Sequence, residues 1–215
     1  IVMWVLFGYS LAFAPTENGI IGNFSWLGLE GVSLDEGYTE GAAIPNMVFC
    51  CFQMMFAVIT PALITGAVAG RMKFKSLFVF IILWSIVVYY PLAHMVWAQN
   101  GVLGLEGIGA LDFAGGDVVH ISSGVSALVL CILLGKRKDY DHAAYRIHNI
   151  PTVMLGASLL MFGWFGFNAG SALAANGQAA HAFMTTAVSA AAALLSWMLC
   201  DVIKNGKPTL IGACT

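Results

Sequence analysis

The stretch Asp112–Gly124, DFAGGDVVHISSG, opens an apolar segment that continues to Leu134. Three ionisable side chains, a glycine pair and two serines therefore lie at the start of a segment that is long enough to enter a bilayer. An Asp near the centre of a membrane helix costs roughly 2.5 to 3.5 kcal/mol on insertion scales. Because polar residues are so costly there, this stretch is predicted to be functional.

The overall composition indicates a membrane protein. The 215 residues are 60% hydrophobic and 9% charged, with a mean hydropathy of +0.85, which excludes an ordinary soluble domain. The five cysteines lack the spacing of zinc or redox sites and are interpreted as small buried hydrophobic residues. The net charge of -2 implies no nucleic-acid partner.

The fold class predicted from the hydropathy pattern is all-α, a polytopic bundle of membrane helices. Measured against the roughly 20 residues that span a hydrocarbon core, the chain has six apolar segments, at about 1–14, 46–70, 76–97, 117–135, 150–173 and 180–203. The first is short and has neither the Met nor the basic flank of a signal peptide. We interpret it as the end of a helix, and residues 1–215 as one partial membrane domain, an internal fragment of a longer protein.

The placement of charge predicts the topology. All nine basic residues follow the second, fourth or sixth segment: Arg71, Lys73, Lys75, Lys136, Arg137, Lys138, Arg146, Lys204 and Lys207. The alternate connections, 15–45, 98–116 and 174–179, contain acidic residues and neither Lys nor Arg. By the positive-inside rule the basic loops are predicted to be cytoplasmic. We expect a multi-pass protein of the cell membrane.

Prolines and one long loop give further expectations. Pro91 predicts a kink late in the third segment, and Pro151 suits the first turn of the fifth. The loop 15–45 is long enough to cap the outer face, with Trp26 and Leu27 as apolar anchors.

Aromatic residues lie near the outer ends of three segments. Phe56 follows Phe52 by four residues on one helical face, Trp97 ends the third segment, and Phe167 and Ser171 lie in the outer half of the fifth. Any one of these rings has the ordinary role of packing or of anchoring at the membrane interface. Together with a hydroxyl and a carboxylate they would form a cation site, because ring faces attract ammonium-type cations by about 0.5 to 2 kcal/mol.

His120 is the most informative single residue. It is either a hydrogen-bonding residue between helices or a pore-lining imidazole that relays a proton. Asp117 precedes it by three residues, on the same face of an α-helix, and Asp112 precedes the helix, where it can cap free amides or bias a nearby cation. Metal binding by these three residues is a weaker hypothesis, because one His and two Asp without a second His at i+4 is a poor zinc pattern.

Eight motifs in order along the chain resemble the ammonium transporter family, Amt/Mep/Rh, on its Amt side. They are GYSLAF (8–13), FQMMFAVITPALITGAVAGRMKF (52–74), PLAHMVW (91–97), DFAGGDVVHISSG (112–124), GKR (135–137), HNIP (148–151), FGWFGFNAGSA (162–172) and GKPTLIGAC (206–214). The resemblance implies a fold of eleven helices with two inverted five-helix repeats. This chain would then contain helices two to seven.

The resemblance also implies roles for particular residues. Trp97, Ser171, Phe56 and Asp112 match the outer ammonium-binding site, Phe56 and Phe167 match the gate of stacked rings, and His120 matches the first of two pore histidines. The second pore histidine lies in a helix beyond residue 215. The family implies a transporter of ammonium and ammonia rather than an enzyme, without cofactor or metal, which forms homotrimers and docks a PII-type protein on its cytoplasmic face.

Three positions depart from the family pattern. Gly70 replaces a common Glu, which leaves a contact at the cytoplasmic end in doubt, Thr185-Thr186 replaces a frequent Asn-Thr pair, and Asp117 replaces a small residue, often Thr.

The depth of His120 sets a condition on the fold. His120 lies only about one turn into its segment, roughly 5 to 8 Å, whereas the family places this histidine near the middle of the membrane. Both hold only if residues 112–116 are recessed below an outer vestibule.

Three alternative functions are consistent with the sequence. An ammonium sensor would use the same fold as a receptor, and a Rh-like channel would pass neutral ammonia. An intramembrane metalloenzyme would use Asp112, Asp117 and His120.

Overall fold

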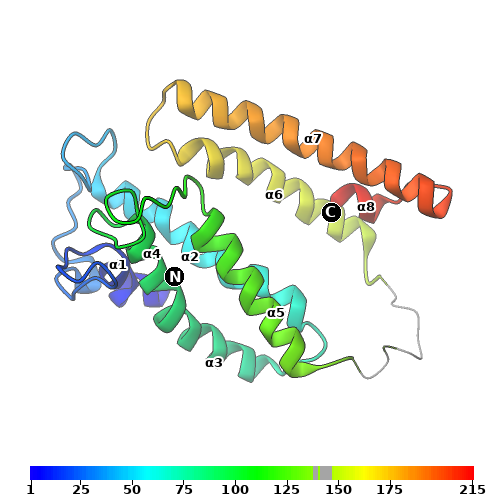
Figure 1. Ribbon diagram of the computed structural model, residues 1–215, viewed down its shortest axis with the longest axis horizontal. Coiled ribbons are helices and arrows are strands. Elements are labelled where there is room, and N and C mark those ends of the chain that lie inside the picture. Colours follow the sequence, from blue (N-terminus) through cyan, green and yellow to red (C-terminus); the bar gives the residue numbers. More distant parts are fainter. Residues whose placement is uncertain (138–139, 141–146) are drawn as a thin grey trace. The chain divides into compact units, whose positions relative to one another are not determined.

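The computed structural model describes residues 1–137, 140 and 147–215 (Figure 1). Two of the predicted cytoplasmic basic residues, Lys138 and Arg146, lie outside the described residues. The chain forms two compact units, Ile1–Asp141 and His142–Thr215. The secondary structure of the described residues is helical apart from an isolated bridge between Gly37 and Pro45, so the all-α prediction is confirmed.

The first unit contains four helical segments that run back and forth. They are η1 and α1 (Trp4–Gly8 and Tyr9–Phe13), α2 (Asn46–Val68), the continuous run of α3, η3 and α4 (Phe74–Trp84, Ser85–Tyr89 and Tyr90–Trp97), and the run of η4 and α5 (Gly116–Ile121 and Ser122–Leu134). A short η2 (Leu27–Leu29) lies in the loop between α1 and α2. The second unit contains α6 (Ile150–Gly170), α7 (Gly177–Asn205) and α8 (Leu210–Cys214).

Five of these segments are long and apolar enough to cross a membrane: Asn46–Val68, Phe74–Trp97, Gly116–Leu134, Ile150–Gly170 and Gly177–Asn205. The first segment, Trp4–Phe13, is a shorter apolar helix. Each predicted apolar segment therefore coincides with a helix. Sequence hydropathy located these helices well because an apolar run of this length has few alternatives to a helix in lipid.

Of the two predicted prolines, Pro151 lies in the first turn of its helix as predicted, whereas the kink at Pro91 stays a prediction. Pro91 lies in the first turn of α4, directly after the π-helical turns of η3. A proline has no N–H to donate to the preceding turn, and the wider π turn accommodates this irregularity within the helix. Pro151 lies in the first turn of α6, where the side chain of Asn149 accepts a hydrogen bond of 2.8 Å from the Thr152 amide.

The acidic end of the first unit, which we define as the end where the loops 15–45 and 98–115 lie, has an aromatic core. Tyr9 stacks on Trp26 with ring centroids 5.5 Å apart, and Tyr38 stacks on Phe49 at 4.7 Å. These contacts fix the loop 15–45 to α1 and α2. Trp26 is thus an anchor as predicted, but Leu27 is 47% exposed, so that part of the prediction is wrong.

At the opposite, basic end of the first unit, Arg71 links the ends of α2 and α5. Its guanidinium donates to the Gly135 carbonyl at 2.6 Å, to the Ala67 carbonyl, and to the Cys131 sulfur at 2.9 Å. A cation at the last carbonyls of α2 and α5 is favourable for both helix dipoles. The contact exists although Gly70 stands where Glu is common, and Gly70 has a φ of +72°, which is strained for Glu.

The cysteines are all free, but only part of their predicted environment is correct. Cys50 is buried, whereas Cys51 and Cys200 are exposed on their units. The interpretation of all five as buried hydrophobic residues is therefore wrong for Cys51 and Cys200.

The second unit is held by contacts between α6 and α7. Phe165 stacks on Phe183 with ring centroids 4.4 Å apart, and the Asn168 amide donates to the Thr186 hydroxyl at 2.9 Å. The second Thr of the Thr185-Thr186 pair thus makes a bond between the two helices. Neither helix has a buried residue within the described residues, so their apolar faces are those of helices made for lipid or for further helices.

The run of η4 and α5 begins at a carboxylate cap. Asp112 accepts two backbone amides at each oxygen: Gly115 at 2.6 Å and Gly116 at 2.8 Å on Oδ1, and Asp117 at 2.8 Å and Val118 at 2.9 Å on Oδ2. The amides at a helix start have no partner within the helix. One side chain therefore satisfies all four, and its negative charge suits the helix N-terminus.

We predict that Asp112→Ala destabilises the protein by about 2 to 4 kcal/mol, because four amides lose a charge-assisted acceptor. The measurement is the free energy of unfolding of the purified full-length protein in detergent. The matched control is Glu40→Gln, which removes a carboxylate from an exposed loop position. Equal stability of the two variants would contradict the structural role of Asp112.

A second prediction concerns Tyr38. Burial raises the pKa of Tyr38 to about 12, against about 10 in an unfolded chain. Its contribution to stability is complete below pH 10 and is lost as the pH rises towards 12. We expect Tyr38→Phe to reduce the loss of stability between pH 8 and pH 11 by about 0.5 to 1 kcal/mol, allowing for the partial exposure of the ring. The same loss in wild type and variant would show that Tyr38 does not titrate with the loop.

Candidate functional site

In the first unit, three aromatic rings and the loop that carries Asp112 lie together at the predicted ammonium site. Phe52 contacts Phe56 with ring centroids 5.0 Å apart at 70°, and Phe56 contacts Trp97 at 5.2 Å and 81°. The Trp97 indole N–H donates to the Asp112 carbonyl at 2.9 Å. Phe56 is 1% exposed, whereas Trp97 is half-buried. The loop thus orients Trp97, which leaves an accessible ring beside a buried one.

This arrangement lies far from the start of α2. A Cβ on Gly115 would lie 3.5 Å from Phe56 Cδ1, so the start of η4 is level with Phe56. Phe56 follows the first residue of α2 by ten positions, or about 15 Å of helix. The stretch 112–116 is therefore recessed relative to the start of α2, and His120, one turn further, is close to the middle of α2. The depth of His120 in the membrane stays a prediction.

Gly115 is required by this geometry, and the sequence motif alone did not identify it as the decisive glycine. It has a φ of +99°, and a Cβ would lie 2.7 Å from Val119 Cγ2. The signal in the sequence was the Gly115-Gly116 pair between a capping Asp and a helix. Its meaning depends on the left-handed backbone at Gly115 and on the close approach of Val119 in the same helical run, which the sequence does not show.

His120 is exposed on the surface of the first unit, and its amide donates to the Gly115 carbonyl at 3.0 Å. Its position in η4 is π-helical. In a π-helix, residues three apart are roughly twice as far apart around the axis as in an α-helix. Asp117 and His120 are therefore not aligned as the α-helical pattern predicted.

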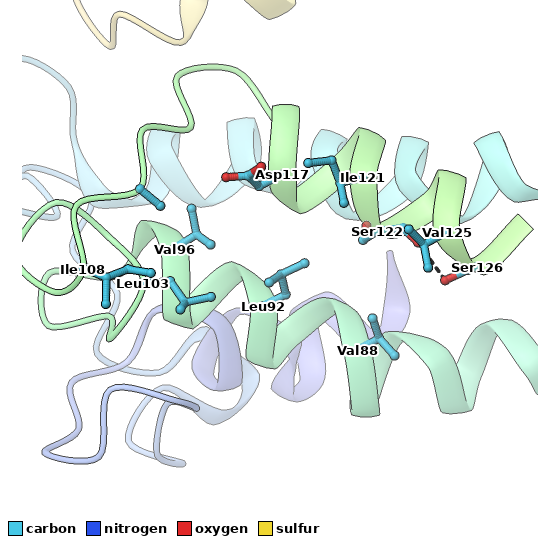
Figure 2. Close-up of a pocket in the computed structure, with 11 residues that line it drawn as sticks. Val88, Leu92, Val96, Leu103, Ile108, Asp117, Ile121, Ser122, Val125 and Ser126 are labelled. Atoms are coloured by element: carbon cyan, nitrogen blue, oxygen red, sulfur yellow. Dashed lines mark hydrogen bonds between the residues drawn. The ribbon is translucent and has the colours of Figure 1, made fainter. Parts of the chain in front are cut away.

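Asp117 lines a separate pocket of the first unit with a cavity volume of about 490 Å³ (Figure 2). The walls come from η3 and α4 on one side and from η4 and α5 on the other, with loop residues at one end. The lining residues are Val88, Leu92, Val96, Leu103, Ile108, Ala110, Asp117, Ile121, Ser122, Val125 and Ser126. His120 is not among them, so the two residues face different surroundings.

The remaining predicted site residues belong to the second unit. Phe167 contacts Trp164 with ring centroids 5.1 Å apart, and the Ser171 hydroxyl donates to the Phe167 carbonyl at 2.8 Å. Ser171 directly follows the last residue of α6 and lies about one helical turn after Phe167. The pairing of Phe56 with Phe167, and of Trp97 with Ser171, joins residues of the two units and stays a prediction.

The carboxylate of Asp112 is occupied by its own helix. With two amides on each oxygen, it contributes negative charge near Trp97 rather than a free ligand atom. In the part of the chain that the structure describes, no group of three His, Cys, Asp or Glu residues lies close enough to hold a metal ion.

Comparison with known proteins identifies the family of this chain. The family model described as Ammonium Transporter Family matches residues 1–215. An ammonium transporter of Bacillus subtilis is 53% identical over 213 residues, which cover 99% of this chain and 51% of that protein. An ammonium transporter of Mycobacterium tuberculosis is 47% identical over 233 residues, covering 99% and 49%. The chain spans about half the length of these curated relatives.

Solved structures agree with this match. The crystal structure of Saccharomyces cerevisiae Mep2 superposes with a TM-score of 0.87 at 36% identity, covering 99% of this chain and 48% of that chain. A structure described as a sensor Amt protein gives a TM-score of 0.81 at 27% identity, covering 99% and 53%. The fold is the helical membrane bundle of Amt and Mep proteins, and the chain belongs to the ammonium transporter family.

Proposed function

We propose that the protein carrying this chain is an ammonium transporter that binds ammonium at an aromatic site, removes a proton and conducts ammonia. One observation carries this proposal: the Trp97 ring is held against Phe56 by its hydrogen bond to the Asp112 loop. A fixed, partly accessible indole beside a carboxylate offers an ammonium-type cation a ring face and negative charge. Ser171 would complete this site with a hydroxyl.

The second step of the proposed mechanism is the passage of ammonia, rather than ammonium, between the aromatic rings of the gate. Phe56 and Phe167 would close the pore, and buried aromatic rings offer too few oxygens to replace the water around an ion. Moving a bare cation into such a low-dielectric site costs many kcal/mol. Ammonium avoids this cost by releasing a proton, whereas potassium has none to release. His120 would carry the proton, with a second histidine in the remainder of the protein, because imidazole both donates and accepts.

The basic end suggests orientation and partners. Arg71, Lys73, Lys75, Lys136 and Arg137 lie at the end of the first unit opposite the aromatic site. We place this end in the cytoplasm and the aromatic site outside a plasma membrane, following the positive-inside rule. A PII-type regulator would dock on the cytoplasmic face, and the whole protein would assemble as a homotrimer.

A sensor is the second candidate function. The favouring observation is the fold match to a structure described as a sensor Amt protein, at a TM-score of 0.81. A sensor would bind ammonium at the same rings without steady transport. A Rh-like neutral ammonia channel is a further alternative, distinguished by the absence of charge movement.

The test is charge movement in proteoliposomes that contain the full-length protein. A jump in ammonium is expected to give a current, and a jump in potassium none. Trp97→Leu should raise the ammonium concentration for half-maximal current about threefold to thirtyfold, because a cation–π contact is lost. Trp197→Leu is the matched control, since Trp197 is 48% exposed on α7. Ammonium binding without current would favour the sensor, and a pH shift without current the neutral channel.

A separate prediction concerns His120. In His120→Ala we expect either loss of the ammonium current or a new potassium current through a widened pore, because the imidazole is the proposed proton carrier at the recessed level of Phe56. The measurement is the ratio of ammonium to potassium current in the same vesicles. An unchanged ratio at an unchanged rate would remove His120 from the mechanism.

A further inference from the structure

The pocket beside Asp117 is separate from the aromatic site and has an unusual distribution of polar groups. Ser122 donates to the Val118 carbonyl at 2.5 Å, and Ser126 donates to the Ser122 carbonyl at 2.7 Å. Ser126 also accepts from the Trp84 indole at 2.9 Å. Within residues 1–137, 140 and 147–215, by contrast, no hydrogen bond or ion pair to the Asp117 carboxylate is present. Asp117 is therefore the polar group of the pocket that lacks a partner in the described chain.

Among the residues that the structure describes, no Lys or Arg forms an ion pair with this carboxylate. The sequence between Lys75 and Lys136 contains neither Lys nor Arg, and this stretch includes every wall of the pocket. An Asp without a partner in a membrane-length segment is energetically costly near the centre of a bilayer, and less so towards the interface. A partner with positive charge would offset this cost.

The apolar walls of the pocket indicate what the remainder of the ligand is like. Val88, Leu92 and Val96 lie four residues apart on one face of η3 and α4 and give an aliphatic wall about 12 Å long. Figure 2 shows Asp117 towards the end where Leu103 and Ile108 of the loop lie, and Val88 and Ser126 towards the other end. A ligand that fits has a cationic head near the acidic end and an apolar chain that runs along the helices. The volume of about 490 Å³ is in the range of ligand pockets.

We propose that this pocket binds phosphatidylethanolamine of the membrane leaflet at the acidic end. Its primary ammonium group donates hydrogen bonds to Asp117, and one acyl chain lies along Val88, Leu92 and Val96. The helical walls belong to the membrane-length segments Phe74–Trp97 and Gly116–Leu134, so we expect the ligand to enter between these helices from the bilayer. The proposal does not depend on ammonium transport, because none of its contacts involves Trp97 or His120.

The test is lipid binding to the delipidated full-length protein, measured by native mass spectrometry. Phosphatidylethanolamine, phosphatidylcholine and phosphatidylglycerol with identical acyl chains are titrated separately. The wild type is expected to prefer phosphatidylethanolamine, because a quaternary ammonium has no N–H to donate and phosphatidylglycerol carries no cation. Asp117→Asn should weaken phosphatidylethanolamine binding about fivefold and remove the preference.

Matched controls separate this site from other surfaces. Glu106→Gln removes a carboxylate from an exposed position of the same loop outside the pocket, and it should leave the preference intact. Val125→Trp, which narrows the pocket, should weaken binding, whereas Leu128→Trp should not. Both positions are similarly exposed on α5 of the first unit, Val125 at 56% and Leu128 at 61%.

Three results would overturn the proposal. The first is equal phosphatidylethanolamine binding by the wild type and Asp117→Asn, as expected if another helix of the full-length protein fills the pocket. The second is equal binding of all three lipids. The third is displacement of bound lipid by n-butylammonium at low concentration through Asp117, which would identify the pocket as a site for soluble amines.

Discussion

The bonds between the Asp112 carboxylate and four backbone amides are the interaction on which the rest of the first unit depends. A helix that starts inside a protein must satisfy its first amides locally, and here one side chain does so. Because this cap is supplied by the chain itself, η4 can begin level with Phe56 rather than level with the first residue of α2. The same loop then presents its carbonyl to Trp97. Asp112 therefore both caps the start of η4 with its carboxylate and orients Trp97 with its carbonyl.

The recessed start explains how a histidine one turn into its segment lies level with the middle of α2. Gly115 turns the chain beside Phe56, where a Cβ would meet Val119, and His120 follows directly. Hydropathy depends only on the apolar run, so it predicts where the helix lies in the sequence but not how deep it begins relative to α2.

Polar side chains of the described residues differ in whether they have a hydrogen-bond partner. The half-buried side chains of Asp112, Asn168 and Ser126 have hydrogen-bond partners in the described structure. Arg71 carries its charge to the carbonyl ends of two helices. Asp117 differs, because it faces an aliphatic pocket, and this contrast is the reason for looking to the lipid for its partner.

The sequence by itself determined the helices, their order and the family. Apolar length and the exclusive placement of basic residues in alternate connections are local properties, so the six segments and the motif residues could be located without coordinates. Contacts between segments decided the rest. The π-helical winding of η4 separated Asp117 from His120, the packing of α2 against the Asp112 loop fixed the depth of the site, and the exposure of Leu27 and Cys51 followed from which faces meet. These outcomes depend on residues far apart in the chain, and no local pattern encodes which neighbour a side chain will meet.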